Sequence, residues 1–76
     1  GMQGPYLHAA AITPDNSNDM TNVSCELQVA VGGNLKIDTL GGETVTLVVV
    51  AGYQYRVRAT RVYATGTTAT GIVSLY

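Results

Sequence analysis

Hydrophobic and polar residues alternate through most of the chain from residue 24 onward, as in β-strands with one buried face. Over residues 24–31 one face carries an apolar series: Cys25, Leu27, Val29 and Val31. The thiol of Cys25 is therefore expected to be buried. The alternation resumes over residues 34–39, and Gly32 and Gly33 between the two segments predict a tight hairpin that joins them.

A second glycine pair, Gly41 and Gly42, predicts a turn before a strand over residues 43–50. Both faces of this strand become apolar after Leu47, because Val48 and Val50 occupy the face that begins with threonines. A strand that is apolar on both faces is normally covered on both. We therefore expect its far end to lie beneath another layer or another subunit.

The alternation changes phase within residues 53–64, which are long for one strand. Tyr55, Val57 and Ala59 share a face, whereas Val62 falls out of phase with them. One extra residue in a strand has this effect, so the pattern predicts a β-bulge or bend near Thr60.

The remaining segments complete an all-β prediction. Residues 8–12 are expected to form a short strand stopped by Pro14, residues 15–22 a polar loop, residues 51–52 a turn, residues 65–71 a turn or loop, and residues 72–76 a last strand tied into a sheet. No segment has helical periodicity. The prediction is a small antiparallel meander of five to six strands, folded as a sandwich or open barrel. We expect a single β domain over residues 1–76 with a flexible start at residues 1–7, and we interpret Gly1 as a residue left by tag cleavage.

Composition limits the function classes. A chain of 76 residues forms one domain with an expected stability of about 4 to 11 kcal/mol, so association between subunits matters. The net charge of −1 argues against a general nucleic-acid binder. The longest apolar run, residues 45–51, is far short of the roughly 20 residues that span a membrane, and no secretory signal is visible.

The residue inventory argues against catalysis and cofactors. His8 and Cys25 are the only residues of their types, and no nucleophile stands in a catalytic motif. Asp15, Ser17, Asp19 and Glu26 are spaced like ligands of a calcium loop, but Met20 occupies the place where that loop requires glycine. We expect a polar surface loop, no metal, no cofactor and no enzymatic activity.

Three of the four cationic side chains lie close together in the sequence: Arg56, Arg58 and Arg61. Arg56 and Arg58 are expected to project from the same face, opposite Tyr55 and Val57. Arginine and tyrosine are both enriched at protein interfaces, which favours a partner-binding surface. The alternative is a solvated face with cross-strand pairs to acidic residues, namely Glu26, Asp38 or Glu43.

The arginine-rich segment runs directly into residues 64–68, Ala-Thr-Gly-Thr-Thr, and the chain closes with Ile-Val-Ser-Leu-Tyr at residues 72–76. Upstream stand four further motifs, at residues 12–19, 31–35, 42–46 and 51–52. In this order, from Ala9 to Tyr76, the motifs resemble the small head-spike base proteins of tailed bacteriophages and of the phage-derived gene transfer agents. The sequence departs from that pattern at residues 53–55, Tyr-Gln-Tyr, where a more apolar or proline-containing stretch is expected.

The resemblance implies a virion structural protein, made in the bacterial cytoplasm, that anchors a surface spike or fibre to the capsid. It implies a capsid vertex protein and a spike fibre protein as partners. From the small size of the domain and the apolar end of residues 45–50 we expect a homo-oligomer, a trimer or a pentamer, and from charge and composition we expect neither nucleic acid nor membrane to be bound. The candidate interface residues are Val48, Val50, Tyr53, Tyr55, Arg56, Arg58 and Arg61. A small carbohydrate-binding module is the alternative, with Tyr53, Tyr55 and Tyr63 stacking on sugars.

Overall fold

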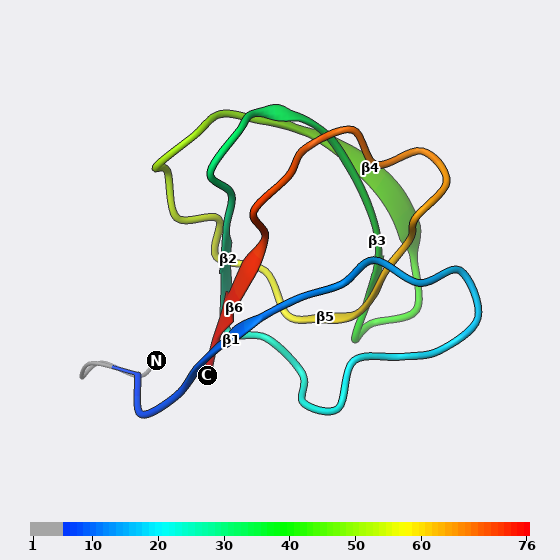
Figure 1. The fold of residues 1–76 in the computed structure, drawn as a ribbon. Coiled ribbons are helices and arrows are strands. Elements are labelled where there is room, and N and C mark those ends of the chain that lie inside the picture. The colour runs from blue at the N-terminus through cyan, green and yellow to red at the C-terminus, as the bar shows by residue number, and fades with distance from the viewer. Residues whose placement is uncertain (1–5) are drawn as a thin grey trace.

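The computed structural model describes residues 6–76, which form six β-strands and no helix (Figure 1). The strands are β1 (Ala9–Ala11), β2 (Glu26–Gln28), β3 (Gly33–Thr39), β4 (Thr44–Val49), β5 (Ala59–Val62) and β6 (Val73–Leu75). The predicted all-β fold of five to six strands is confirmed. Within the described part of the chain, no helix is long and apolar enough to cross a membrane. The expected flexible start falls mainly on residues 1–5, outside the described residues.

Two three-stranded antiparallel sheets make up a small β-sandwich. One sheet has the order β1-β6-β2 and the other the order β4-β3-β5. Figure 1 shows them around a common interior, with β3 and β4 on one side and β1, β2 and β6 on the other. The last strand, β6, is the centre of its sheet, so the C-terminus is tied in on both edges as predicted.

The β3–β4 hairpin forms as the sequence predicts. Ile37 lies opposite Val45 and Leu35 opposite Leu47, and the Thr39 N–H donates to the Glu43 carbonyl at 2.8 Å. Gly42 has a φ of 105°, a conformation that glycine adopts without strain. The glycine turn and the hydrophobic alternation therefore predict the same pairing, which joins two strands that are adjacent in the sequence.

The predicted hairpin between residues 24–31 and 34–39 is wrong. Strand β2 is shorter than predicted and pairs with β6, whereas β3 pairs with β4 and β5. Gly32 lies where the chain passes from one sheet to the other, and a Cβ added there would be 2.6 Å from the Val49 carbonyl oxygen. Glycine is needed at position 32 because the backbone of Val49 approaches closely there. A glycine pair in the sequence does not distinguish such a close approach from a hairpin turn.

Residues 53–64 are not one strand. Tyr55 forms an isolated bridge to Leu27 of the first sheet, and only residues 59–62 join the second sheet as β5. The predicted bulge is confirmed: Asp38 lies opposite Arg61 and Thr39 opposite Ala59, which leaves Thr60 as the extra residue.

The core lies between the two sheets and draws residues from both. Its buried hydrophobic members are Leu27, Val29, Leu35, Ile37, Val49, Ala59, Val62, Ala69 and Ile72. The prediction for residues 24–31 is only half right, because Cys25 is half-buried and Val31 is 57% exposed. Ser24 and Glu26, on the opposite face of this segment, are buried as well. Residues 55–59 lie against that second face and bond to Ser24 and Glu26, which the alternation alone does not indicate.

Candidate functional site

An exposed apolar surface follows the end of β4, which we call the valine–tyrosine surface and define as Val48, Val50, Tyr53 and Tyr55. Val48 is 80% exposed, and Val50 and Tyr53 are more than half exposed. The Tyr53 and Tyr55 rings contact each other with centroids 4.8 Å apart, and the Tyr55 hydroxyl accepts a hydrogen bond from the Val50 N–H at 2.8 Å. The structure thus places four of the predicted interface residues side by side. Val48, Val50 and Tyr53 are largely exposed within residues 6–76, whereas Tyr55 is half-buried.

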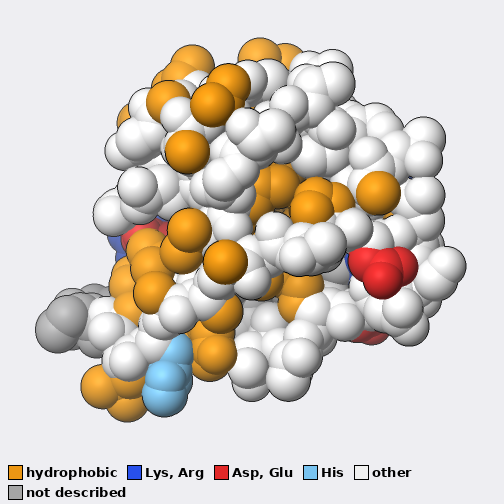
Figure 2. All heavy atoms as spheres, in the orientation of Figure 1, with side chains coloured by type: hydrophobic (Ala, Val, Ile, Leu, Met, Phe, Trp, Pro, Cys, Tyr) orange, Lys and Arg blue, Asp and Glu red, His pale blue; other side chains and the backbone are white. Residues whose placement is uncertain are grey.

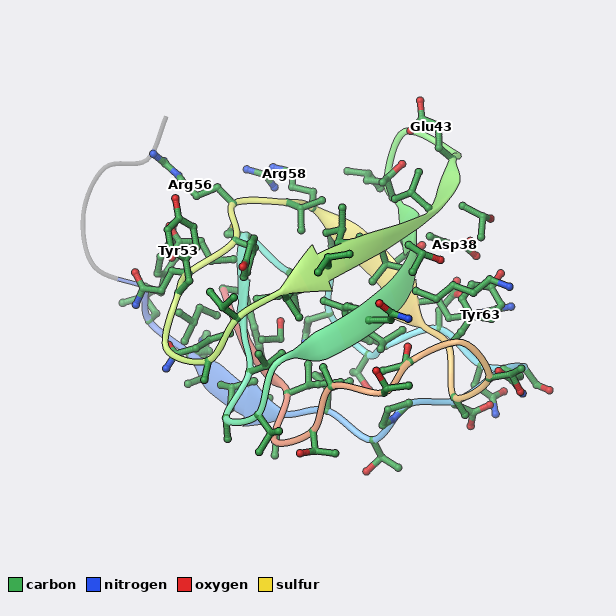
Figure 3. The ribbon with its side chains drawn as sticks, turned by 90° about the horizontal axis from the view of Figure 1, so that it is seen from above. Asp38, Glu43, Tyr53, Arg56, Arg58 and Tyr63 are labelled. Atoms are coloured by element: carbon green, nitrogen blue, oxygen red, sulfur yellow. The ribbon has the colours of Figure 1, made fainter. Side chains whose placement is uncertain are left out.

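Two of the three predicted arginines lie beside this surface. Figure 3 shows Arg56 and Arg58 on the same side of the molecule as Tyr53. Arg56 forms an ion pair with Glu26 at 3.5 Å between Nε and Oε2, one of the acidic partners that the solvated-face hypothesis named. Arg58 is exposed and forms no ion pair with any residue of the described chain. Tyr55 and Val57 pack against the core, so the predicted division of the two faces is confirmed.

Glu26 is a buried carboxylate beneath Arg56. Its side chain is 9% exposed, and its Oε2 also accepts a hydrogen bond from the Tyr6 hydroxyl at 2.9 Å. That bond to a carboxylate raises the pKa of Tyr6, because loss of the phenol proton would place two negative charges side by side. The guanidinium of Arg56 therefore supplies the positive charge nearest to Glu26 in residues 6–76.

Arg61 lies elsewhere and stabilises the fold. Its Nε donates to Asp19 Oδ1 at 2.9 Å and its Nη1 donates to the Asn16 carbonyl at 3.3 Å, which ties the loop of residues 13–22 to β5. Its guanidinium also lies 5.7 Å from the Tyr63 ring centroid. The structure therefore separates Arg61 from Arg56 and Arg58.

The three tyrosines of the sugar-binding alternative do not form one platform. Figure 3 shows Tyr63 beside Asp38, on the opposite side of the molecule from Tyr53. The Tyr63 hydroxyl donates to Asp38 Oδ2 at 2.8 Å, and its ring contacts Lys36 with Nζ 4.9 Å from the centroid. At the valine–tyrosine surface, Tyr53 is 60% exposed, whereas Tyr55 is half-buried and its hydroxyl accepts a hydrogen bond from Val50.

Comparison with models of known protein families gives no match, and comparison with curated proteins gives none either. Comparison with solved structures gives a chain from a structure described as the capsid of a native GTA (gene transfer agent) particle computed with C5 symmetry. The two chains are 42% identical with a TM-score of 0.87, and the match covers 95% of this chain and 84% of the other. The chain belongs to the same family as this capsid component. The match has high sequence identity and extends over nearly the whole chain. The resemblance to gene-transfer-agent proteins is therefore confirmed at the level of this capsid family.

The loop whose residues are spaced like calcium ligands is stabilised by hydrogen bonds within the loop itself. Asp15 Oδ1 accepts hydrogen bonds from the backbone N–H groups of Ser17 at 2.8 Å and Asn18 at 3.1 Å. These bonds lower the pKa of Asp15, because they favour its charged form. Among residues 6–76, no three His, Cys, Asp or Glu side chains lie close enough together to hold a metal ion.

The sequence analysis missed the free sheet edges of this member of the capsid family. The hydrophobic pattern predicts Val48 as an apolar side chain that needs a cover, but it does not reveal the free backbone edge of β4 on which Val48 lies. The strand expected over residues 8–12 is present as Ala9–Ala11, but three alanines show no alternation that would indicate a free outer edge. The signal that could have found both is the absence of charged residues and proline from residues 9–13 and 44–50, since edge strands of soluble proteins normally carry such residues.

Proposed function

We propose that this chain is a structural component of a gene transfer agent or phage virion, the base of a head spike that anchors a surface fibre to the capsid. The observation that supports the proposal is the 42% identical capsid component, whose match extends over nearly the whole chain. The residues of the chain favour the same conclusion, because the exposed surface is apolar and uncharged around Val48 and Val50 and suits protein contact better than chemistry.

A ring of identical copies is the form of assembly that we propose. The domain is small, and its valine–tyrosine surface is exposed in the single chain, so association would bury surface that the fold leaves open. Of the two copy numbers that the sequence analysis considered, five fits the C5 symmetry named for the capsid of the related particle. The interface would include Val48, Val50, Tyr53 and Tyr55, with Arg56 and Arg58 at its margin, whereas Arg61 holds the fold.

Deletion of the gene in a particle-producing strain tests the proposed function. Particles from the deletion strain are expected to have intact heads that lack surface spikes, and expression of the gene in trans should restore the spikes. A matched complementing variant with Ser17→Ala, an exposed loop substitution, should restore them as well as the natural sequence. Particles that keep their spikes without the gene would refute the assignment.

Carbohydrate binding is tested on the same purified protein. The separation of Tyr63 from Tyr53 leaves no shared stacking platform, so we expect a glycan array to give no binding that Tyr53→Ala abolishes. Glycan binding that depends on Tyr53 would favour the carbohydrate-binding module instead.

A further inference from the structure

The two sheets have four outer edges, and the chain itself covers two of them. The edge of β2 pairs with Tyr55, since the N–H groups of Leu27 and Tyr55 donate to each other's carbonyls at 2.9 and 2.8 Å. The edge of β5 receives the N–H groups of Asp15 and Met20, each at 2.8 Å. No segment within residues 6–76 pairs with the outer edges of β1 and β4. These two strands are therefore the places where another chain can add a strand.

The free edge of β4 is defined by the alternation of an antiparallel pair. The bond from the Thr39 N–H to the Glu43 carbonyl fixes which residues face β3, so Thr44, Thr46 and Val48 direct their N–H and C=O groups outward. At the end of the row, the outward Val50 N–H is taken by the Tyr55 hydroxyl at 2.8 Å. An open edge of unpaired backbone groups thus runs from Thr44 to Val48.

This edge lacks the features that keep edge strands apart. Residues 44–50 contain no charge and no proline, and four of the seven are valine. A segment of high β-propensity and zero charge on an open edge is a template for pairing with another strand. The edge is therefore expected to be covered in the assembled protein.

The free edge of β1 offers a matching surface. His8 and Tyr76 exchange backbone hydrogen bonds at 2.7 and 2.9 Å, and the Ile12 N–H donates to the Ile72 carbonyl at 2.8 Å. The alternation then directs the backbone groups of Ala9 and Ala11 outward, and the side chains of both are exposed. Figure 2 shows hydrophobic side chains gathered beside the pale blue histidine on this face. The short alanine side chains leave room for larger side chains on a neighbouring strand.

We propose that β4 of one copy pairs with β1 of the next copy, so that the β4-β3-β5 sheet of one subunit continues into the β1-β6-β2 sheet of its neighbour. Both edges are uncharged, and the two outward residues of the shorter β1 can pair within the three outward residues of β4, where the exposed Val48 meets the exposed alanines. This inference deepens the proposed function by naming the surface through which the copies associate.

The placement of the two edges determines the type of assembly. β4 and β1 lie on opposite sides of the molecule in both Figure 1 and Figure 3. Each copy then offers one edge and accepts another, which is a heterologous contact. Such contacts form a ring when the rotation between copies closes, and the proposed ring is this closed form. Pairing of β4 with a second β4 would instead give an isologous dimer and leave both β1 edges open.

Cysteine cross-linking tests the pairing directly. In a Cys25→Ser background, Ala9→Cys or Ala11→Cys is combined with Thr46→Cys or Val48→Cys, which gives four double variants that sample the register. Because facing Cβ atoms of paired strands lie about 4.5–5.5 Å apart, mild oxidation should link at least one double variant into a ladder of oligomers that ends at the ring size. Each single variant should stay unlinked. A linked dimer from Val48→Cys alone would show β4 self-pairing and overturn the proposal.

A proline substitution provides an independent measurement. Thr46→Pro removes one outward N–H without removing a bond of the β3–β4 ladder, whereas the control Thr46→Val keeps the N–H and the branched shape. We expect Thr46→Pro to fold, as judged by far-ultraviolet circular dichroism, yet to elute as a monomer, and Thr46→Val to assemble like the natural protein. Normal assembly of Thr46→Pro overturns the proposal, and if that variant does not fold, the four cysteine pairs decide it.

The outcome is separable from the test of the proposed function, because these experiments use purified protein and that test uses particles. Assembly without any β1–β4 link, or a strictly monomeric natural protein, would overturn this inference even if deletion of the gene removes the spikes. Conversely, β1–β4 links in a protein whose deletion leaves the spikes in place would refute the proposed function and keep the inference.

Discussion

Ser24 illustrates how single polar side chains join segments that are distant in the sequence. It is fully buried, donates to the Val57 carbonyl at 2.8 Å and accepts from the Ala59 N–H at 3.0 Å. Arg61 does the same on the surface, where it holds Asp19 of the polar loop. These contacts fix the course of the chain between the two sheets, where no regular ladder exists.

Ser24→Ala should therefore be clearly destabilising. The substitution leaves a buried N–H and a buried carbonyl without their partner, which costs about 1–3 kcal/mol of the free energy of unfolding. Ser74→Ala is the matched control, because Ser74 is equally buried but its hydroxyl has no hydrogen-bond partner in residues 6–76. Denaturant unfolding of both variants checks the expectation, and equal losses of stability would contradict it.

Asp38 should make the stability depend on pH in the acid range. Hydrogen bonds from the Thr44 and Tyr63 hydroxyls favour its charged form and lower its pKa from the usual 3.8. A pKa that is lower in the folded than in the unfolded chain stabilises the fold above the unfolded value, and this contribution is lost as the pH falls through the folded value. We expect the melting temperature to fall on acidification below about pH 4.

Two variants isolate the contribution of Asp38. Asp38→Asn should melt lower than the natural protein at pH 7 and lose less on acidification, and Tyr63→Phe should return the Asp38 pKa toward its usual value by removing one donor. The carboxyl carbon shift of Asp38, followed by NMR through the titration, measures the pKa directly. Titration of Asp38 at its usual value in the natural protein would contradict this account.

At the scale of elements, local pairing could be predicted from the sequence and distant pairing could not. The β3–β4 hairpin and the Thr60 bulge depend on alternation and turn residues within a few positions, and both are confirmed. The β1-β6-β2 sheet pairs Ala9 with Leu75, near opposite ends of the chain, and no local pattern carries that information. For the same reason Gly32 was interpreted as part of a turn, although its neighbour in space is Val49.

Gly32→Ala tests the interpretation of that crossing. A Cβ at position 32 would lie 2.6 Å from the Val49 carbonyl oxygen and 3.1 Å from the Val50 Cα, and both are backbone atoms that cannot move aside cheaply. We expect a loss of about 1–3 kcal/mol in the free energy of unfolding. Gly41→Ala is the control, because its nearest contact is the flexible Glu43 side chain at 3.4 Å. A loss at Gly41 as large as at Gly32 would favour the turn interpretation.

At the scale of the whole molecule, the candidate interface could be predicted in part. Val48 and Val50 were identified because a strand that is apolar on both faces needs a cover, and the single chain leaves both exposed. The sequence groups Arg61 with Arg56 and Arg58 because the three are close together, but the partner of Arg61 is Asp19, which lies 42 residues away and comes near only through the fold. A free edge is a property of the whole topology, so it became visible only once all pairings were known.

Arg58 is the charge that best tests the margin of the proposed interface. It is exposed, lies on the same side as Tyr53 and forms no ion pair within residues 6–76, so its reversal should leave the folded monomer intact. In a contact between subunits, Arg58→Glu would lose its pairing and add repulsion, and we expect assembly to weaken by about tenfold or more, or 1.4 kcal/mol. Light scattering after size exclusion measures this against multiples of the 7.9 kDa chain, with five copies expected for the natural protein. Arg58→Lys, which keeps the charge, should assemble better than Arg58→Glu. Unchanged assembly of Arg58→Glu with an unchanged melting temperature would return Arg58 to a solvated face, outside the interface.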